Sequence, residues 1–249
     1  MIAALTTIRR DAARAEAADS DWKSLYKIGG VAALLSVVFL PIQIAVCLMS
    51  PPPDTVIGWF RLFQDNRLVG LLDLDLLLLV DQVLAILVFL ALYVALRRVN
   101  ESFMAIAIAF GLVSAVLFIA SNPAFAMLSL SDQYAAAGTE AQRTMFLTAG
   151  QAVLVTWQGS AFQASYLLGS LAPIIISAVM LQDRSRVFGK STAYLGILAN
   201  VIALGLFVPK VGVYISIFSV VFLWIWYILL ARRLFQLGHG VLSEVTNRS

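Results

Sequence analysis

The chain has 249 residues, of which 61% are hydrophobic and 12% are charged, whereas soluble domains are about half apolar and about a quarter charged. This composition excludes a soluble globular protein and a disordered chain, and the single cysteine excludes a disulfide scaffold. The net charge of +3 is small, and the basic residues lie where membrane topology requires them, so no nucleic-acid partner is expected.

Apolar stretches long enough to cross a bilayer as helices, about 20 residues each, determine the predicted architecture. Six occur, at 25–49, 68–96, 103–130, 161–181, 192–208 and 211–230. Each satisfies its own backbone hydrogen bonds as a helix, and none has the alternating pattern of a barrel strand. The sequence therefore predicts an all-α, polytopic integral membrane bundle of six transmembrane helices over 25–238, embedded in a lipid bilayer.

The basic residues predict the orientation of this bundle. Of the 17 lysines and arginines, 13 lie on the side of the N-terminus and 4 on the other side: Arg61, Arg67, Arg143 and Lys210. By the positive-inside rule, both termini are cytoplasmic and the chain is a multi-pass protein of the cell membrane. The stretches 1–24 and 239–249 are expected to be cytoplasmic tails, the first of them frayed because it has little apolar face.

The first of two long extracytoplasmic segments, 50–67, predicts a short helix that begins after Asp54 or Thr55 as its cap. Its apolar residues recur with the helical spacing i, i+3, i+4 and i+7: Val56, Trp59, Phe60 and Phe63. A helix with one apolar face and one polar face is expected to lie flat on the outer surface of the membrane.

The second extracytoplasmic segment, 131–160, predicts a longer helix. Thr139 and Gln142 have the spacing of a capping box, and the helix is expected to continue to Trp157. Its predicted apolar face comprises Met145, Phe146, Ala149 and Val153. Two roles stay open for both extracytoplasmic helices, which either cap the bundle or cover a binding site as a lid.

Five stretches of the chain carry a resemblance to a known family. They are LLDLDLLLLVDQVLAILVFLALYVALRR (71–98), ASNPAFAML (120–128), SYLLGSLAPIIISAVML (165–181), TAYLGILANVIALGLFVP (192–209) and WYILLARRLFQLG (226–238). Together they resemble the multi-pass membrane family catalogued as domain of unknown function 4386. The resemblance covers about 25–238 and implies a six-helix membrane domain. It implies no reaction and no catalytic residue.

The inventory of reactive side chains argues against an enzyme. The only histidine, His239, follows the last apolar stretch, and the only cysteine, Cys47, lies within the first. A His/Cys metal cluster and a Ser-His-Asp triad are therefore excluded, and no GxxxxGK[ST] phosphate loop occurs. The sequence predicts a non-enzymatic protein with no catalytic residues, no metal and no cofactor.

Three aspartates of the second stretch are its most informative polar residues: Asp73, Asp75 and Asp81. Asp73 and Asp75 are expected at the headgroups, where three basic residues are candidate partners: Arg61, Arg67 and Lys210. Asp81 lies deeper, where a charged aspartate costs about 2.5 to 3.5 kcal/mol on insertion scales. Something must offset that cost, and no lysine or arginine lies at its depth.

Counting depth at about 1.5 Å per residue places other polar side chains at the level of Asp81. The predicted polar layer, and hence the predicted ligand-binding set, comprises Gln43, Asp81, Asn122, Gln163, Tyr166, Tyr214 and Ser216, with Ser121 beside them. Pro41 and the Asn122–Pro123 pair are expected to kink their helices next to this layer. Two interpretations stay open, a closed hydrogen-bond network that fastens the helices and a hydrated ligand or ion site.

These observations lead to one leading hypothesis and one alternative. The leading hypothesis is a protein that binds a small or lipid-like ligand, or a membrane partner, in an outward-opening polar cavity. The alternative is a proton- or cation-coupled transporter of small molecules that uses Asp81 as its coupling residue. Small residues at i+4 spacing in 161–177 are expected to pack within the bundle, with a homodimer or partner interface as the other use.

The predicted orientation can be tested by cysteine labelling in intact cells. In a Cys47→Ser background, Ser185→Cys is expected on the cytoplasmic side and Ala136→Cys on the outer side, because the basic residues divide unequally. An impermeant thiol reagent should therefore label only position 136. Labelling at position 185 in intact cells would reverse the orientation.

Overall fold

The computed structural model describes residues 2–157, 159–184 and 187–239, with the side chains of 2–21 and Cys47 left out. Within these residues the chain forms helices and no strands. Six helical stretches in the described part are long and apolar enough to cross a membrane: Trp22–Val46, Leu76–Leu96, Glu101–Ala136, Glu140–Gln182, Lys190–Phe207 and Gly212–Gly238. The predicted all-α fold is confirmed, and by length and composition this is a membrane-embedded helical protein.

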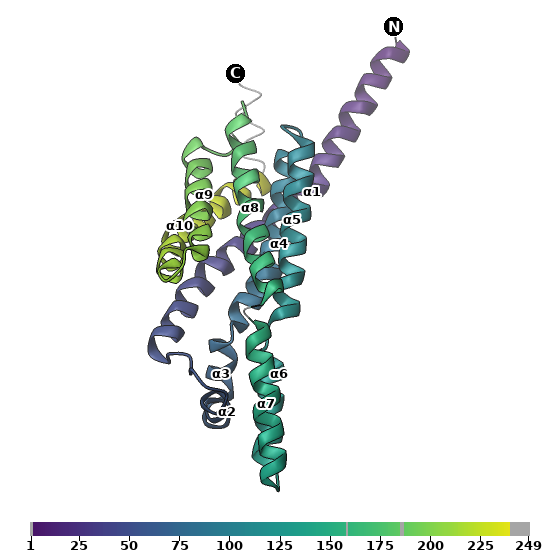
Figure 1. Cartoon of the computed structure of the whole chain (residues 1–249). Coiled ribbons are helices and arrows are strands. Elements are labelled where there is room, and N and C mark those ends of the chain that lie inside the picture. The colour runs from purple at the N-terminus through teal and green to yellow at the C-terminus, as the bar shows by residue number, and fades with distance from the viewer. Residues whose placement is uncertain (1, 158, 185–186, 240–249) are drawn as a thin grey trace.

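The first helix, α1 (Ile2–Met49), differs from the prediction at its beginning. It runs without interruption through the stretch 2–24, for which a frayed tail was expected, and extends beyond the rest of the bundle (Figure 1). This stretch is rich in alanine, the strongest helix former, and it continues a helix that the following span already nucleates. The predicted second tail, 239–249, lies outside the described residues except for His239.

Six helices form the main core: α1, α4 (Leu76–Leu96), α5 (Glu101–Ser121), α8 (Ser160–Gln182), α9 (Lys190–Ala203) and α10 (Gly212–Gly238). Small residues bring α5 and α8 close together. Ser114 Oγ donates to the carbonyl of Ser165 at 2.8 Å, and Ser165 Oγ donates to the carbonyl of Ser114 at 3.0 Å. A Cβ atom added at Gly169 would lie 2.7 Å from Ser114 Oγ. This part of the small-residue stretch therefore packs within the bundle, as expected.

The two ends of the membrane domain lie on the same side. A Cβ atom added at Gly238, the last residue of α10, would lie 2.7 Å from Cγ of Lys27 on α1. We call this the terminal end of the bundle, and the opposite end, which carries α2, α3, α6 and α7, the hairpin end (Figure 1). Which end faces the cytoplasm stays a prediction.

Four helices pack together at the hairpin end: α2 (Val56–Asp65), α3 (Arg67–Asp73), α6 (Ala124–Ala136) and α7 (Glu140–Trp157). The four predicted apolar residues of α2 are all buried, and Thr55 is its cap. They form a cluster, here called the hairpin cluster, that comprises Val56, Trp59, Phe60, Phe63, Leu74, Ala124 and Met127. Protein rather than lipid covers the apolar face of α2, so the expectation that α2 lies flat on the membrane is wrong.

Helix α7 begins as predicted but packs through a different face. Gln142 N–H donates to Thr139 Oγ1, and Thr139 N–H donates to Gln142 Oε1, both at 3.3 Å, which confirms the capping box. Met145, expected on the apolar face, is 57% exposed. The contact centres instead on Gly150, where an added Cβ would lie 2.6 Å from Val56 Cγ1. The absence of a side chain there lets α2 approach, which rotates the contact face away from Met145.

Two of the membrane helices are interrupted. The second predicted stretch divides into α3 and α4 at Leu74 and Asp75, and Asp75 has a left-handed backbone with φ of 63°. The third divides into α5 and α6 at Asn122–Pro123, where a kink was expected. The stretch Glu140–Gln182 has 43 residues. At about 1.5 Å per residue this exceeds a hydrocarbon core of about 30 Å, so the hairpin end projects beyond the bilayer.

The hairpin cluster predicts which side chains stabilise this end. Phe60 is fully buried, and Phe60→Ala should lower the free energy of unfolding by about 3 to 5 kcal/mol. Met145→Ala removes an exposed side chain from the same region and should change it by less than about 0.5 kcal/mol. Denaturant unfolding in detergent micelles measures both, and equal effects of the two substitutions would contradict the packing.

Candidate functional site

The predicted polar layer is divided in the structure into groups that lie apart. Depth counting treats helices as straight and parallel, whereas α1 contains a proline and the second stretch is broken above Asp81. Depth also does not tell which face of a helix a residue occupies. The single layer around Asp81 is therefore wrong as a placement, and ligand binding by its members stays a prediction.

The first group surrounds the break between α3 and α4. Gln43 Nε2 donates to the carbonyl of Leu72 at 3.0 Å and to Asp75 Oδ1 at 3.4 Å. Asn122 Nδ2 donates to the carbonyl of Leu74 at 2.8 Å, and its Oδ1 accepts from Ala124 N–H at 3.0 Å. Two side-chain amides from other helices thus satisfy carbonyls at the break, which a membrane-embedded interruption requires.

Two carboxyls lie at the same break. Ser50 Oγ donates to Asp73 Oδ2 at 3.1 Å, and Asp73 is only 2% exposed. Among the described residues, Asp73 Oδ1 has no hydrogen-bond partner and neither Asp73 nor Asp75 forms an ion pair. We call Gln43, Ser50, Asp73, Asp75 and Asn122 the polar junction.

Burial governs the acidity of these two carboxyls. It is the larger cause that raises the pKa of Asp75 to about 7, and the negative charge of Asp73 is the smaller one. Burial also raises the pKa of Asp73, while the hydrogen bond from Ser50 opposes that increase. The expected pairing with Arg67 is wrong, because Arg67 Nη2 forms a salt bridge of 2.8 Å with Asp132.

Asp81 belongs to a second group, deeper in the bundle. It is 9% exposed and lies on α4 beside Ser36 of α1, with Tyr227 of α10 as a further polar neighbour. Its Oδ1 atom has no hydrogen-bond partner among the described residues. Neither Ser36 nor Tyr227 was among its predicted partners, although Ser36 precedes Gln43 by two helical turns on the same helix.

The remaining predicted residues lie elsewhere. Tyr166 of α8 and Ser216 of α10 share a short hydrogen bond between their hydroxyls. Gln163 is exposed, and Tyr214 is 75% exposed. The expectation that Tyr214 joins the layer around Asp81 is therefore wrong, because its helix turns that residue outward.

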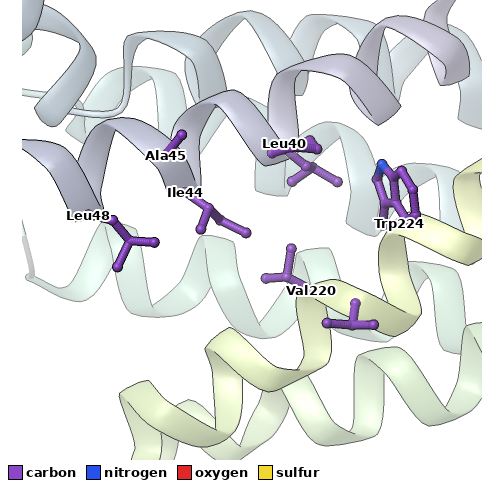
Figure 2. A pocket seen from close by; sticks show the side chains of 8 residues that line it. Leu40, Ile44, Ala45, Leu48, Val220 and Trp224 are labelled. Atoms are coloured by element: carbon purple, nitrogen blue, oxygen red, sulfur yellow. The ribbon is translucent and has the colours of Figure 1, made fainter.

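A groove of about 520 Å³ lies between α1 and α10 (Figure 2). Its lining is apolar throughout: Leu40, Pro41, Ile44, Ala45, Leu48, Val220, Val221 and Trp224. Figure 2 shows Ile44 and Leu48 on α1 across the groove from Val220 on α10. None of the predicted ligand-binding residues lines it, so this cavity differs from the polar one that was expected.

The proline of α1 links the groove to the chain's hydrogen bonding. Pro41 has no N–H, so the carbonyl of Val37, four residues earlier, lacks its usual helical partner. Trp224 Nε1 donates to that carbonyl at 2.8 Å and thereby ties α10 to α1 at the proline. The indole N–H is used in this contact, so the wall of the groove presents the apolar part of Trp224.

Sequence reasoning named Pro41 but missed the groove. The signal was present in part, since a proline within a span frees a carbonyl that some donor must reach. Nothing in the sequence shows that Trp224, 187 positions after Val37, supplies that donor.

Comparisons of the chain with protein-family models, with curated proteins and with solved structures found no match. The family suggested by the resemblance therefore stays a prediction, and the candidate sites rest on the geometry of this chain alone.

The link between Pro41 and Trp224 can be tested with a double-mutant cycle. Trp224→Phe removes the donor to Val37 and should lower stability by about 0.6 to 2 kcal/mol, the range for hydrogen bonds between membrane helices. Pro41→Ala restores a backbone N–H that can bond to the carbonyl of Val37, so in that background Trp224→Phe should cost clearly less. Steric-trapping or thermal unfolding in bicelles measures the four variants. Equal costs in both backgrounds would show that the indole N–H contributes nothing.

Proposed function

We propose that this membrane protein binds a lipid-like amphiphile, with the acyl chain of the ligand in the groove between α1 and α10. The observation that carries the proposal is the groove itself. Its volume of about 520 Å³ lies in the range of about 300 to 1,000 Å³ that is usual for ligand pockets. Its walls are formed by apolar side chains from two helices that α1's proline and Trp224 hold in a fixed relation.

The chemistry of the walls selects the ligand class. The one polar side-chain atom of the lining residues, Trp224 Nε1, already donates to Val37. A polar ligand buried against such walls would lose its hydrogen bonds to water without replacement, at a cost of several kcal/mol per group. An alkyl chain has no such groups and gains dispersion contacts along both helices.

The position of the groove supports lateral entry from the bilayer. Leu48 is 77% exposed and Val221 is 55% exposed, and both line the groove on long apolar helices. From Leu40 to Leu48 the groove follows α1 for about 12 Å at about 1.5 Å per residue. A lipid can therefore slide its chain between the helices without leaving the apolar phase.

Transport coupled to a proton or a cation is the second candidate function. The observation that favours it is Asp81, a carboxyl 9% exposed within a membrane helix, with one oxygen unpartnered among the described residues. Ionisable residues at such positions are expensive and commonly serve ion or substrate pathways. A flux assay in liposomes with Asp81→Asn separates this function from ligand binding, since the groove does not include Asp81.

Filling the groove tests the lipid proposal. Ala45→Trp places a large side chain between α1 and α10 and should reduce the lipid that copurifies with the protein by at least severalfold, as measured by native mass spectrometry. Val116→Trp enlarges a residue of α5 that is 64% exposed and lies outside the groove, so it serves as the matched control. Brominated acyl chains should also quench the fluorescence of Trp224 in the native protein and in the control.

Two results would contradict the proposal. One is an equal amount of bound lipid in the Ala45→Trp and Val116→Trp proteins, which would mean that lipid binds without using the groove. The other is crosslinking of a photoreactive residue at position 44 to a second protein chain rather than to lipid, which would identify the groove as a helix-docking surface.

A further inference from the structure

The polar junction lies on the other side of α1 from the groove and has a chemistry of its own. Gln43 and Ser50 face α3 and α4, where they contact Leu72, Asp75 and Asp73. The groove residues of α1, in contrast, face α10. What happens at the junction is therefore separable from the proposed lipid binding.

Two carboxyls without an ion pair are costly at a buried position. Asp73 is 2% exposed, and the charge of Asp73 acts on Asp75 two residues away. The nearest arginine in sequence, Arg67, is engaged by Asp132. Like charges close together disfavour each other's ionised form, and burial adds to the cost, so such a pair requires a positive charge or a proton.

The second observation is the unused oxygen of Asp73. Its Oδ2 accepts from Ser50, but Oδ1 has no partner within the described part of the chain although the side chain is almost completely buried. A buried polar atom in this state is rare in native proteins and indicates a bound water, ion or ligand. The backbone does not explain it, because the amides of Gln43 and Asn122 already satisfy the carbonyls of Leu72 and Leu74.

The geometry points to a binding site for a hard divalent cation of the Ca²⁺ type at the α3–α4 break, with Asp73 and Asp75 as its charged ligands. Two ionised carboxylates balance the charge of one divalent ion. Carboxylate, hydroxyl and amide oxygens are the ligands that Ca²⁺ takes, in an irregular geometry that Mg²⁺ tolerates poorly. Soft metals are disfavoured, because the junction contains neither cysteine nor histidine.

The position of the ligands defines what the ion does. Ser50 follows the end of α1, Asp73 ends α3 and Asp75 precedes α4. A cation held by Asp73 and Asp75 therefore fixes the two halves of the broken helix to each other, and through Ser50 it holds both against α1. Binding stabilises the folded protein, because the unfolded chain does not bring these residues together.

The experiment uses the full-length protein in detergent, stripped with a chelator and then titrated with CaCl₂. Saturating Ca²⁺, at about 100 times its dissociation constant, should raise the midpoint of thermal unfolding by roughly 5 to 10 °C. Asp73→Asn and Asp75→Asn should each abolish the shift while the chelated proteins stay folded, since asparagine keeps the shape and removes the charge. Asp132→Asn removes an acid that is exposed and lies at the same end of the molecule, and it should retain the shift.

Equilibrium dialysis with ⁴⁵Ca²⁺ on the unmodified protein keeps the test decisive if an asparagine variant does not fold, with one bound ion per chain expected. The proposal is overturned by no saturable binding, by the same shift with NaCl at matched ionic strength, or by a shift that persists in folded Asp73→Asn and Asp75→Asn proteins. Ala45→Trp should keep the Ca²⁺ shift, so failure of the cation site and failure of the lipid proposal are distinguishable.

Discussion

The requirement that backbone groups in a membrane find hydrogen-bond partners explains the arrangement of this molecule. The hydrogen bonding of its helices is interrupted at Pro41, at Leu74–Asp75 and at Asn122–Pro123. At the first two interruptions a side chain from a distant part of the chain reaches a carbonyl: Trp224 reaches Val37, and Gln43 and Asn122 reach Leu72 and Leu74. These side chains fasten the helices to one another where their own hydrogen bonding fails.

Both candidate sites lie at such interruptions, on the two sides of α1. Towards α10, the proline and its indole partner border an apolar groove. Towards α3 and α4, the amides satisfy the carbonyls of the break and leave two carboxyls with no ion pair among the described residues. One helix therefore separates a surface suited to an alkyl chain from a cluster of oxygens suited to a cation, and each chemistry follows from the side chains that the interruption gathers.

Sequence reasoning predicts the helices well and their mutual placement poorly. The six spans, the cap of α7 and the buried face of α2 follow from hydrophobic length, capping residues and helical spacing, which are local signals. The rotation of α7 about Gly150 and the partners of Asp81 depend on contacts between distant segments. The break at Asp75 was missed because 68–96 is apolar without a proline or glycine at that point, and only the tertiary contacts of Gln43 and Asn122 stabilise it.

Occupation of the groove between α1 and α10 by an acyl chain is tested most directly by an experimental structure in native-lipid nanodiscs. We predict elongated density along α1 from Leu40 to Leu48, in contact with Val220 and the apolar part of Trp224. Trp224 Nε1 should remain bonded to the carbonyl of Val37 beneath that density. A groove closed by direct contact of α1 with α10, or occupied by a helix of another chain, would contradict lipid binding there.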